Sequence, residues 1–123
     1  VIPRFITAFQ TGGQPTIYGD GEQSRDFTYV DNVVSANIAA ATVPKAGGEI
    51  FNIACGQRIT INELAYKIGT LLNKEARPQY EPPRPGDVKH SLADISKAGK
   101  LLNYSTLVNI DSGLQKTIEW FTG

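Results

Sequence analysis

The chain has 123 residues, which suits one domain or part of one, and its 41% apolar content argues against disorder. Twelve basic residues balance twelve acidic ones, so nothing in the net charge favours nucleic acid or an anionic membrane, and anions must be bound by local arginines. Cys55 is the single cysteine, which excludes an internal disulfide and fits a reducing, cytoplasmic setting, and no run of about eighteen apolar residues predicts a membrane span.

The first third of the chain predicts a helix and two short strands. The helix starts near Pro3, ends at Gly12-Gly13, and has apolar residues at helical spacing: Ile2, Phe5, Ile6 and Phe9. Residues 16–18 and 26–30 are strand candidates on either side of the turn Gly19-Asp20-Gly21. Because the chain starts directly on this apolar helix, we expect a longer parent protein, and we expect the apolar face to be exposed without it.

The middle of the chain predicts two helices around a strand. Asp31 caps a helix that ends before Pro44, with Val34, Ile38 and Ala41 on its inward face. Residues 49–54 form the strand. Thr60 and Glu63 have the spacing of a capping box, and they open a helix with an apolar face of Leu64, Ile68, Leu71 and Leu72.

The last third predicts an extended segment and two more helices. Residues 78–85 are proline-rich and indicate a loop or an edge strand. Asp94 caps a short helix, with Ile95, Ala98 and Leu101 or Leu102 inside. Asp111 or Ser112 caps the final helix, whose inward residues are Leu114, Ile118 and Phe121. The whole pattern predicts a mixed α/β fold with short strands and about five helices.

Two stretches, residues 18–27 and 84–91, each combine an arginine with glycines and an aspartate. A guanidinium grips phosphate oxygens through forked donors, so Arg25 and Arg84 are able to clamp a diphosphate from two sides. Asp87 is then placed to accept hydrogen bonds from a ribose. Simpler roles remain open: Arg25 pairing with Asp26 or Glu22, a solvated Arg84, and Asp87 capping a turn.

Other polar residues predict no catalytic or metal site. His90 lacks a partner at metal-ligand spacing, and Ser91 lacks the setting of a nucleophile. Asn52, in an otherwise apolar strand, is expected mainly to tie down neighbouring backbone, and Cys55 reads as an ordinary small buried thiol. No glycine-rich fingerprint follows a strand and opens a helix, so the chain itself is expected to bind no dinucleotide cofactor.

In their order and spacing these segments resemble the C-terminal, substrate-binding part of extended short-chain dehydrogenase/reductases that act on nucleotide sugars. The matching segments cover residues 1–123 and include 1–6, 18–31, 51–53, 84–96 and 113–121. The chain is most similar to UDP-sugar 4-epimerases, including those acting on N-acetylated sugars. UDP-glucuronate decarboxylases and nucleotide-sugar 4,6-dehydratases have related tails, and a stand-alone sugar-nucleotide-binding module is the alternative outside the enzymes.

The resemblance implies roles for particular residues. Arg25 and Arg84 would hold the two phosphates and Asp87 the ribose, while Ile17 and Tyr18 would pack the uracil. Ser91 falls where 4-epimerases leave or deny room for a 2-acetamido group on the sugar. Ala54 or Cys55 would line the same pocket.

The chemistry implied by the resemblance needs more than this chain offers. A 4-epimerase uses bound NAD to remove and return a hydride at the fourth carbon of a UDP-sugar, with a Tyr-x-x-x-Lys pair for proton transfer. No tyrosine here is followed four residues later by lysine. The resemblance therefore implies a parent, commonly a homodimer, whose N-terminal NAD-binding Rossmann half lies outside the chain, and it implies that the chain alone is inactive.

Overall fold

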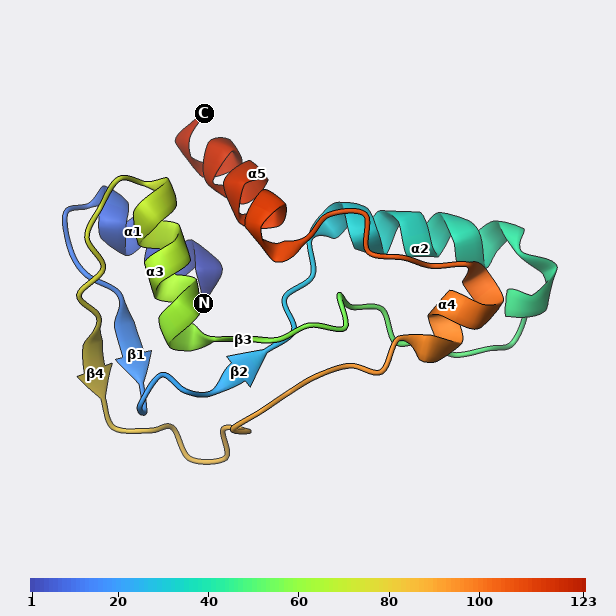
Figure 1. Ribbon diagram of the computed structural model, residues 1–123, viewed down its shortest axis with the longest axis horizontal. Coiled ribbons are helices and arrows are strands. Elements are labelled where there is room, and N and C mark those ends of the chain that lie inside the picture. The colour runs from blue at the N-terminus through green and yellow to red at the C-terminus, as the bar shows by residue number, and fades with distance from the viewer. The chain divides into compact units, whose positions relative to one another are not determined.

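The computed structural model describes all 123 residues, and five α-helices and four short strands confirm the mixed α/β prediction (Figure 1). Contacts between residues divide the chain into two units. The first unit consists of residues 1–25, 59–91 and 114–123, and the second of residues 26–58 and 92–113. None of the helices combines the length and the apolar character that crossing a membrane would require.

In the first unit, helix α1 (Ile2–Gln10) packs against helix α3 (Ile61–Leu71) (Figure 1). Phe5, Ile6 and Phe9 of α1 are at most 3% exposed. Burying each such side chain contributes about 1.5–3 kcal/mol relative to leaving it in water. The expectation that this face would be exposed is therefore wrong, because α3 presents its own buried face, Leu64, Ala65 and Ile68, to receive it.

The start of α3 follows the predicted capping box. Thr60 Oγ1 accepts a hydrogen bond from the Glu63 amide, and the Glu63 carboxylate accepts one from the Thr60 amide. Strand β3 (Ile59–Thr60) leads into this cap and pairs antiparallel with strand β2 (Ser24–Arg25). Leu71, predicted inward, is 40% exposed because it lies on the last turn of the helix.

Strand β1 (Thr16–Tyr18) pairs in parallel with strand β4 (Gln79–Glu81), so three residues of the proline-rich segment 78–85 form an edge strand and the rest is loop. Gln14 joins the two approaches to this pair. Its Nε2 donates to the Glu75 carbonyl at 3.1 Å, and its Oε1 accepts from the Arg77 amide at 2.8 Å. The Gln14 side chain thus makes two hydrogen bonds of the kind that backbone groups make between paired strands, and these bonds set the register of β1 against β4.

In the second unit, helix α2 (Val30–Thr42), the short 3₁₀ helix η1 (Pro44–Ala46) and helix α4 (Ser96–Leu102) enclose a small core. The buried members of this core are Ala36, Ala46, Ala98, Leu102 and Tyr104. The Tyr104 hydroxyl donates to the Ala54 carbonyl at 2.7 Å, which satisfies a polar group that burial would otherwise penalise.

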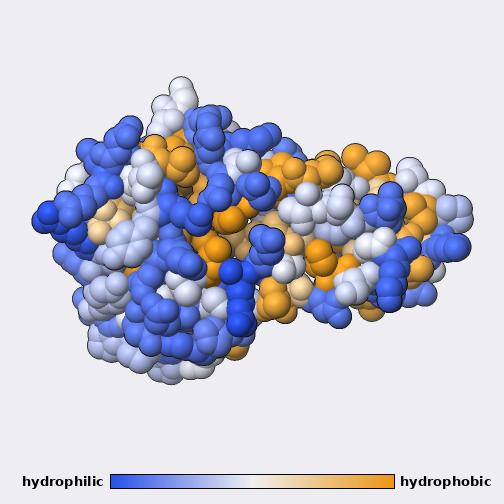
Figure 2. Space-filling view, viewed as in Figure 1, coloured by the Kyte–Doolittle hydropathy of each residue, from blue (hydrophilic) through white to orange (hydrophobic).

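Helix α2 presents a different face to this core from the predicted one. Val34 and Ile38 are 49% and 61% exposed, and apolar surface follows α2 in Figure 2. The buried positions are Asn32 and Ala36, four residues apart. Asn32 Oδ1 accepts from the amides of Leu107 and Val108, both at 2.9 Å, and its Nδ2 donates to the Val108 carbonyl at 2.8 Å. These bonds set the rotation of the helix.

Several predicted boundaries are wrong for reasons of pairing and capping. Residues 26–30 and 49–54 form no strand, because no other segment of the chain pairs with either of them through a ladder of backbone hydrogen bonds. The N-cap of α2 is Tyr29, with Asp31 in its first turn. Helix α5 (Ile110–Thr122) is capped by Asn109, whose Oδ1 accepts from the Ser112 amide at 2.9 Å.

The remaining helix predictions agree with the structure. Asp94 Oδ1 accepts from the Ser96 amide at 2.9 Å at the start of α4, although the formal N-cap is Ile95. In α5, Leu114 and Ile118 are buried and Phe121 is half-buried, as predicted.

Candidate functional site

A cavity of about 400 Å³ opens in the first unit, within the size range of small-molecule sites. Helix α1, strands β1 and β2 and the loop after β4 supply most of its wall. The polar side chains of that wall are Arg4, Gln14, Thr16, Tyr18, Gln23, Arg25, Arg84 and Asp87. Three guanidinium groups and one carboxylate give the cavity an excess of positive charge.

Arg25 and Asp87 form an ion pair at one side of the cavity, with 2.5 Å between Nη2 and Oδ1. Nη1 of Arg25 also donates to the carbonyls of Ser24 at 2.8 Å and Lys89 at 3.3 Å. The guanidinium is therefore held in one orientation from several sides. Asp26 has other partners, since its two carboxylate oxygens accept from the amides of Cys55 and Gly56, so the surface pair of Arg25 with Asp26 is absent.

Arg84 and Tyr18 form a cation–π contact in the same cavity, with the guanidinium carbon 4.0 Å from the ring centroid. The pKa of the Tyr18 hydroxyl is lowered, first by a hydrogen bond to Arg84 and by its charge, and further by Arg4. A ring whose face and hydroxyl are both approached by guanidinium groups is a planar platform beside positive charge.

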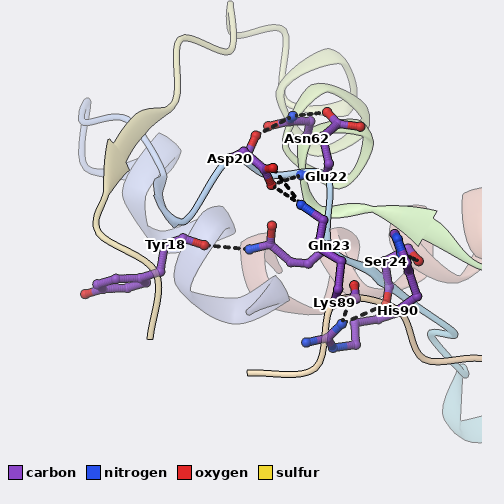
Figure 3. Close-up of polar contacts among 9 residues, drawn as sticks. Tyr18, Asp20, Glu22, Gln23, Ser24, Asn62, Lys89 and His90 are labelled. Carbon is purple, nitrogen blue, oxygen red and sulfur yellow. Dashed lines mark hydrogen bonds and ion pairs between the residues drawn. The ribbon is translucent and has the colours of Figure 1, made fainter. Parts of the chain in front are cut away.

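The turn between β1 and β2 is fixed by Gln23 and Asn62 (Figure 3). Gln23 is buried, and its Nε2 donates to the Tyr18 carbonyl at 2.6 Å. Asn62 Nδ2 donates to the Asp20 carbonyl at 3.1 Å and to Glu22 Oε1 at 2.7 Å. Gly21 has a φ of +77°, a backbone region that glycine adopts without strain.

The loop that carries Arg84 and Asp87 is tied to β2 through Ser24 (Figure 3). The Ser24 amide donates to the Lys89 carbonyl at 2.9 Å, and the Ser91 amide donates to the Ser24 carbonyl at 3.0 Å. Ser24 Oγ and His90 Nδ1 are 2.9 Å apart. Lys89 adds an ion pair to Asp20 at 2.6 Å, which lowers the pKa of that carboxyl. These contacts bring residues 84–91 against residue 25.

The structure thus gathers five of the six predicted site residues in the wall of one cavity: Ile17, Tyr18, Arg25, Arg84 and Asp87. Ser91 is exposed and is not in that wall. The sequence reasoning did not assign Arg4, Gln14 or Gln23 to the site. Val1, Arg4 and Ala8 all line the cavity, and their spacing of three and four residues places them on one face of a helix. This helical spacing is the sequence signal that could have assigned Arg4 to the site.

The other polar residues considered in the sequence analysis have structural partners. Asn52 is exposed and donates weakly to the Asp94 carbonyl at 3.5 Å, whereas Asn32 is the buried amide that ties down backbone. Burial and the nearby Asp26 charge raise the pKa of the Cys55 thiol. No three His, Cys, Asp or Glu side chains are grouped as a metal ion would require.

The cavity thus combines an excess of positive charge with the aromatic ring of Tyr18. Residues 1–54 match the NAD dependent epimerase/dehydratase family. A UDP-glucuronate 4-epimerase from Thermodesulfobacterium geofontis is 41% identical over 95% of this chain and 36% of its own length. A UDP-glucose 4-epimerase from Mycolicibacterium smegmatis is 34% identical over 98% of this chain and 38% of its own length.

Solved structures show the same relationship. A UDP-glucose 4-epimerase from Thermotoga maritima, solved with UDP-glucose, superimposes with a TM-score of 0.92 at 37% identity over 98% of this chain and 38% of its own. A UDP-N-acetylglucosamine 4-epimerase from Methanobrevibacter ruminantium gives 0.91 at 41% identity, over 99% and 39%. The chain spans less than two-fifths of the length of each of these relatives.

Proposed function

We propose that this chain is the nucleotide-sugar-binding part of an NAD-dependent UDP-sugar 4-epimerase. The observation that carries the proposal is the cavity in which Arg25, Arg84 and Asp87 meet beside Tyr18. Two guanidinium groups suit a diphosphate, a carboxylate suits ribose hydroxyls, and an aromatic ring suits a base. The names of the relatives, UDP-glucuronate and UDP-glucose 4-epimerases, support the reaction.

Within this proposal each part of the UDP-sugar contacts particular residues of the cavity. The diphosphate lies between Arg25 and Arg84. Asp87 pairs with Arg25 in the absence of ligand, and on binding it gives up part of this ion pair to accept hydrogen bonds from the ribose. The uracil packs on Ile17 and Tyr18. The sugar extends toward Ser91, which lies outside the wall of the cavity.

The chain's own residues do not fit an NAD site. A dinucleotide fingerprint requires a glycine turn from a strand into a helix. Gly19 and Gly21 follow β1, but they lead into β2. We therefore propose that NAD, present in a solved UDP-glucuronic acid 4-epimerase from Bacillus cereus, is held by an N-terminal Rossmann half outside these residues. The hydride chemistry would be supplied there. A homodimeric parent and a cytoplasmic setting also stay predictions.

The test is product analysis on the full-length protein. Incubation with NAD and UDP-glucose, UDP-glucuronate or UDP-N-acetylglucosamine, followed by NMR, should show the 4-epimer of at least one sugar. Arg84→Ala should weaken UDP binding about ten-fold or more, since each charge-assisted bond contributes about 1.5–3 kcal/mol. The 123-residue chain alone should show no turnover. Absence of UDP binding to the full-length protein would refute the proposal.

A decarboxylase is the second candidate. A UDP-N-acetyl-alpha-D-glucosaminuronate decarboxylase from Bacillus cytotoxicus is 35% identical over 98% of this chain. The same NMR experiment separates the two, because a decarboxylase converts the uronate to a pentose and releases carbon dioxide. A 4,6-dehydratase would instead yield a 4-keto-6-deoxy sugar.

A further inference from the structure

We propose that Arg4 selects the nucleobase: it donates to the carbonyl at C4 of a uracil or thymine ring stacked on Tyr18, and it disfavours cytosine. The inference rests on the proposed function, because it names a specificity-determining residue in the same cavity. Neither the sequence pattern nor the chemistry assigned above gives Arg4 a role.

The position of Arg4 follows from the packing of α1. Val1, Arg4, Phe5 and Ala8 all line the cavity and lie on one face of the helix. Phe5 is 3% exposed and anchors that face, so the backbone at Arg4 is held rigidly while its side chain stays exposed at the cavity wall.

Arg4 has no carboxylate partner. Asp87 is the single carboxylate in the cavity wall, and it already pairs with Arg25. A guanidinium carries five donors and no acceptor, so the donors of Arg4 are available to a ligand that offers acceptors.

Tyr18 is the platform that brings such a ligand to Arg4. The planar guanidinium of Arg84 already lies over the ring, 4.0 Å from its centroid, so this face accepts a planar group. When Arg84 turns to the phosphates, a base takes that place. Arg4 and Tyr18 line the same cavity, and the pKa of the Tyr18 hydroxyl is lowered first by Arg84 and further by Arg4. An edge of a stacked base therefore falls near Arg4.

The chemistry of that edge decides which base is accepted. Uracil and thymine carry a carbonyl at C4, which accepts hydrogen bonds, whereas cytosine carries an amino group that donates. Arginine offers donors alone, so it pairs with the carbonyl and leaves the amino group facing another donor. A mismatch of this kind loses the hydrogen bond and places two donors against each other.

The test measures binding of UDP, dTDP and CDP to the full-length protein by calorimetry. The wild type should bind UDP and dTDP more tightly than CDP. Arg4→Gln, whose amide offers both a donor and an acceptor, should reduce the UDP-over-CDP preference by about ten-fold. Arg4→Lys, with donors alone, should keep most of it. Arg77→Gln is the matched control, because Arg77 is exposed, pairs with Glu75 and lies outside the cavity wall.

Three outcomes would overturn the inference, and they are distinguishable. An equal loss of UDP and CDP affinity in Arg4→Gln, with a weaker dependence on salt, would assign Arg4 to the phosphates. An unchanged preference would remove Arg4 from the site while the proposed function stands. A wild-type protein that binds none of the three nucleotides would refute the proposed function, and the inference with it.

Discussion

Arg25 and Asp87 are 62 positions apart in the chain, yet Nη2 of one lies 2.5 Å from Oδ1 of the other. The pair joins the two arginine-containing segments of the sequence at one wall of the cavity. It also gives each residue a partner in the absence of ligand, so binding of an anion must compete with Asp87 for the Arg25 guanidinium.

The first prediction separates the binding role of this pair from its structural role. The side chains are 26% and 42% exposed, and partly exposed pairs contribute about 0.2–1 kcal/mol to stability. Arg25→Ala should therefore lower the free energy of unfolding by about 1 kcal/mol but weaken UDP binding about ten-fold or more. Denaturant titration and calorimetry on the full-length protein measure the two effects. Unchanged UDP affinity in a folded variant would place Arg25 outside the site.

The second prediction concerns the turn after β1. A Cβ at Gly21 would lie 1.9 Å from Asn62 Oδ1, and φ is +77°, so Gly21→Ala should destabilise the fold by about 3 kcal/mol. Gly12→Ala is the control, because φ is +79° there and nothing lies within 4 Å of the added atom. It should cost about 1 kcal/mol from backbone strain alone. Equal losses of stability in urea titrations would contradict the proposed clash with Asn62.

The third prediction tests the buried amide of the second unit. Asn32→Ala would leave the amides of Leu107 and Val108 without their acceptor and should cost about 3 kcal/mol of folding stability. Asn52→Ala, at an exposed asparagine with one weak bond, should change stability by less than about 0.5 kcal/mol. Thermal unfolding followed by circular dichroism compares them, and similar melting temperatures would be the contrary result.

The fourth prediction concerns the size of the sugar. Ser91→Tyr should cut kcat/KM for UDP-N-acetylglucosamine by about ten- to a hundred-fold and spare UDP-glucose, because a bulky ring fills the room for an acetamido group. The Ser91 side chain is exposed and its backbone bond to Ser24 does not depend on it, so folding should be preserved. Ser105→Tyr, at another exposed serine, is the control. Equal loss for both sugars would exclude Ser91 as the gate.

The fifth prediction follows from the raised pKa of Cys55, which burial causes first and the Asp26 charge second. A raised folded pKa means that the stability linked to the neutral thiol is complete below the usual value of 9.0 and is lost as the pH rises through the folded pKa. Alkylation by iodoacetamide near pH 8.5 should be slower in the folded chain than in urea. The reverse order of rates would show an activated thiol.

Local patterns were enough to predict the helices and the capping box at Thr60 and Glu63, because helical spacing and capping involve residues within four positions of each other. They were also enough to single out Arg25, Arg84 and Asp87, since these residue types beside glycines suit phosphate and ribose.

The tertiary structure alone decided which groups meet. The pairing of β1 with β4, the rotation of α2 set by Asn32, and the presence of Arg4 and Tyr18 in one cavity wall all depend on contacts between distant segments. The same is true of residues 26–30 and 49–54, which have strand-like sequences but no partner strand in this chain. A strand is completed by hydrogen bonds to another segment, and a cavity by side chains from several, so neither is encoded within one stretch of sequence.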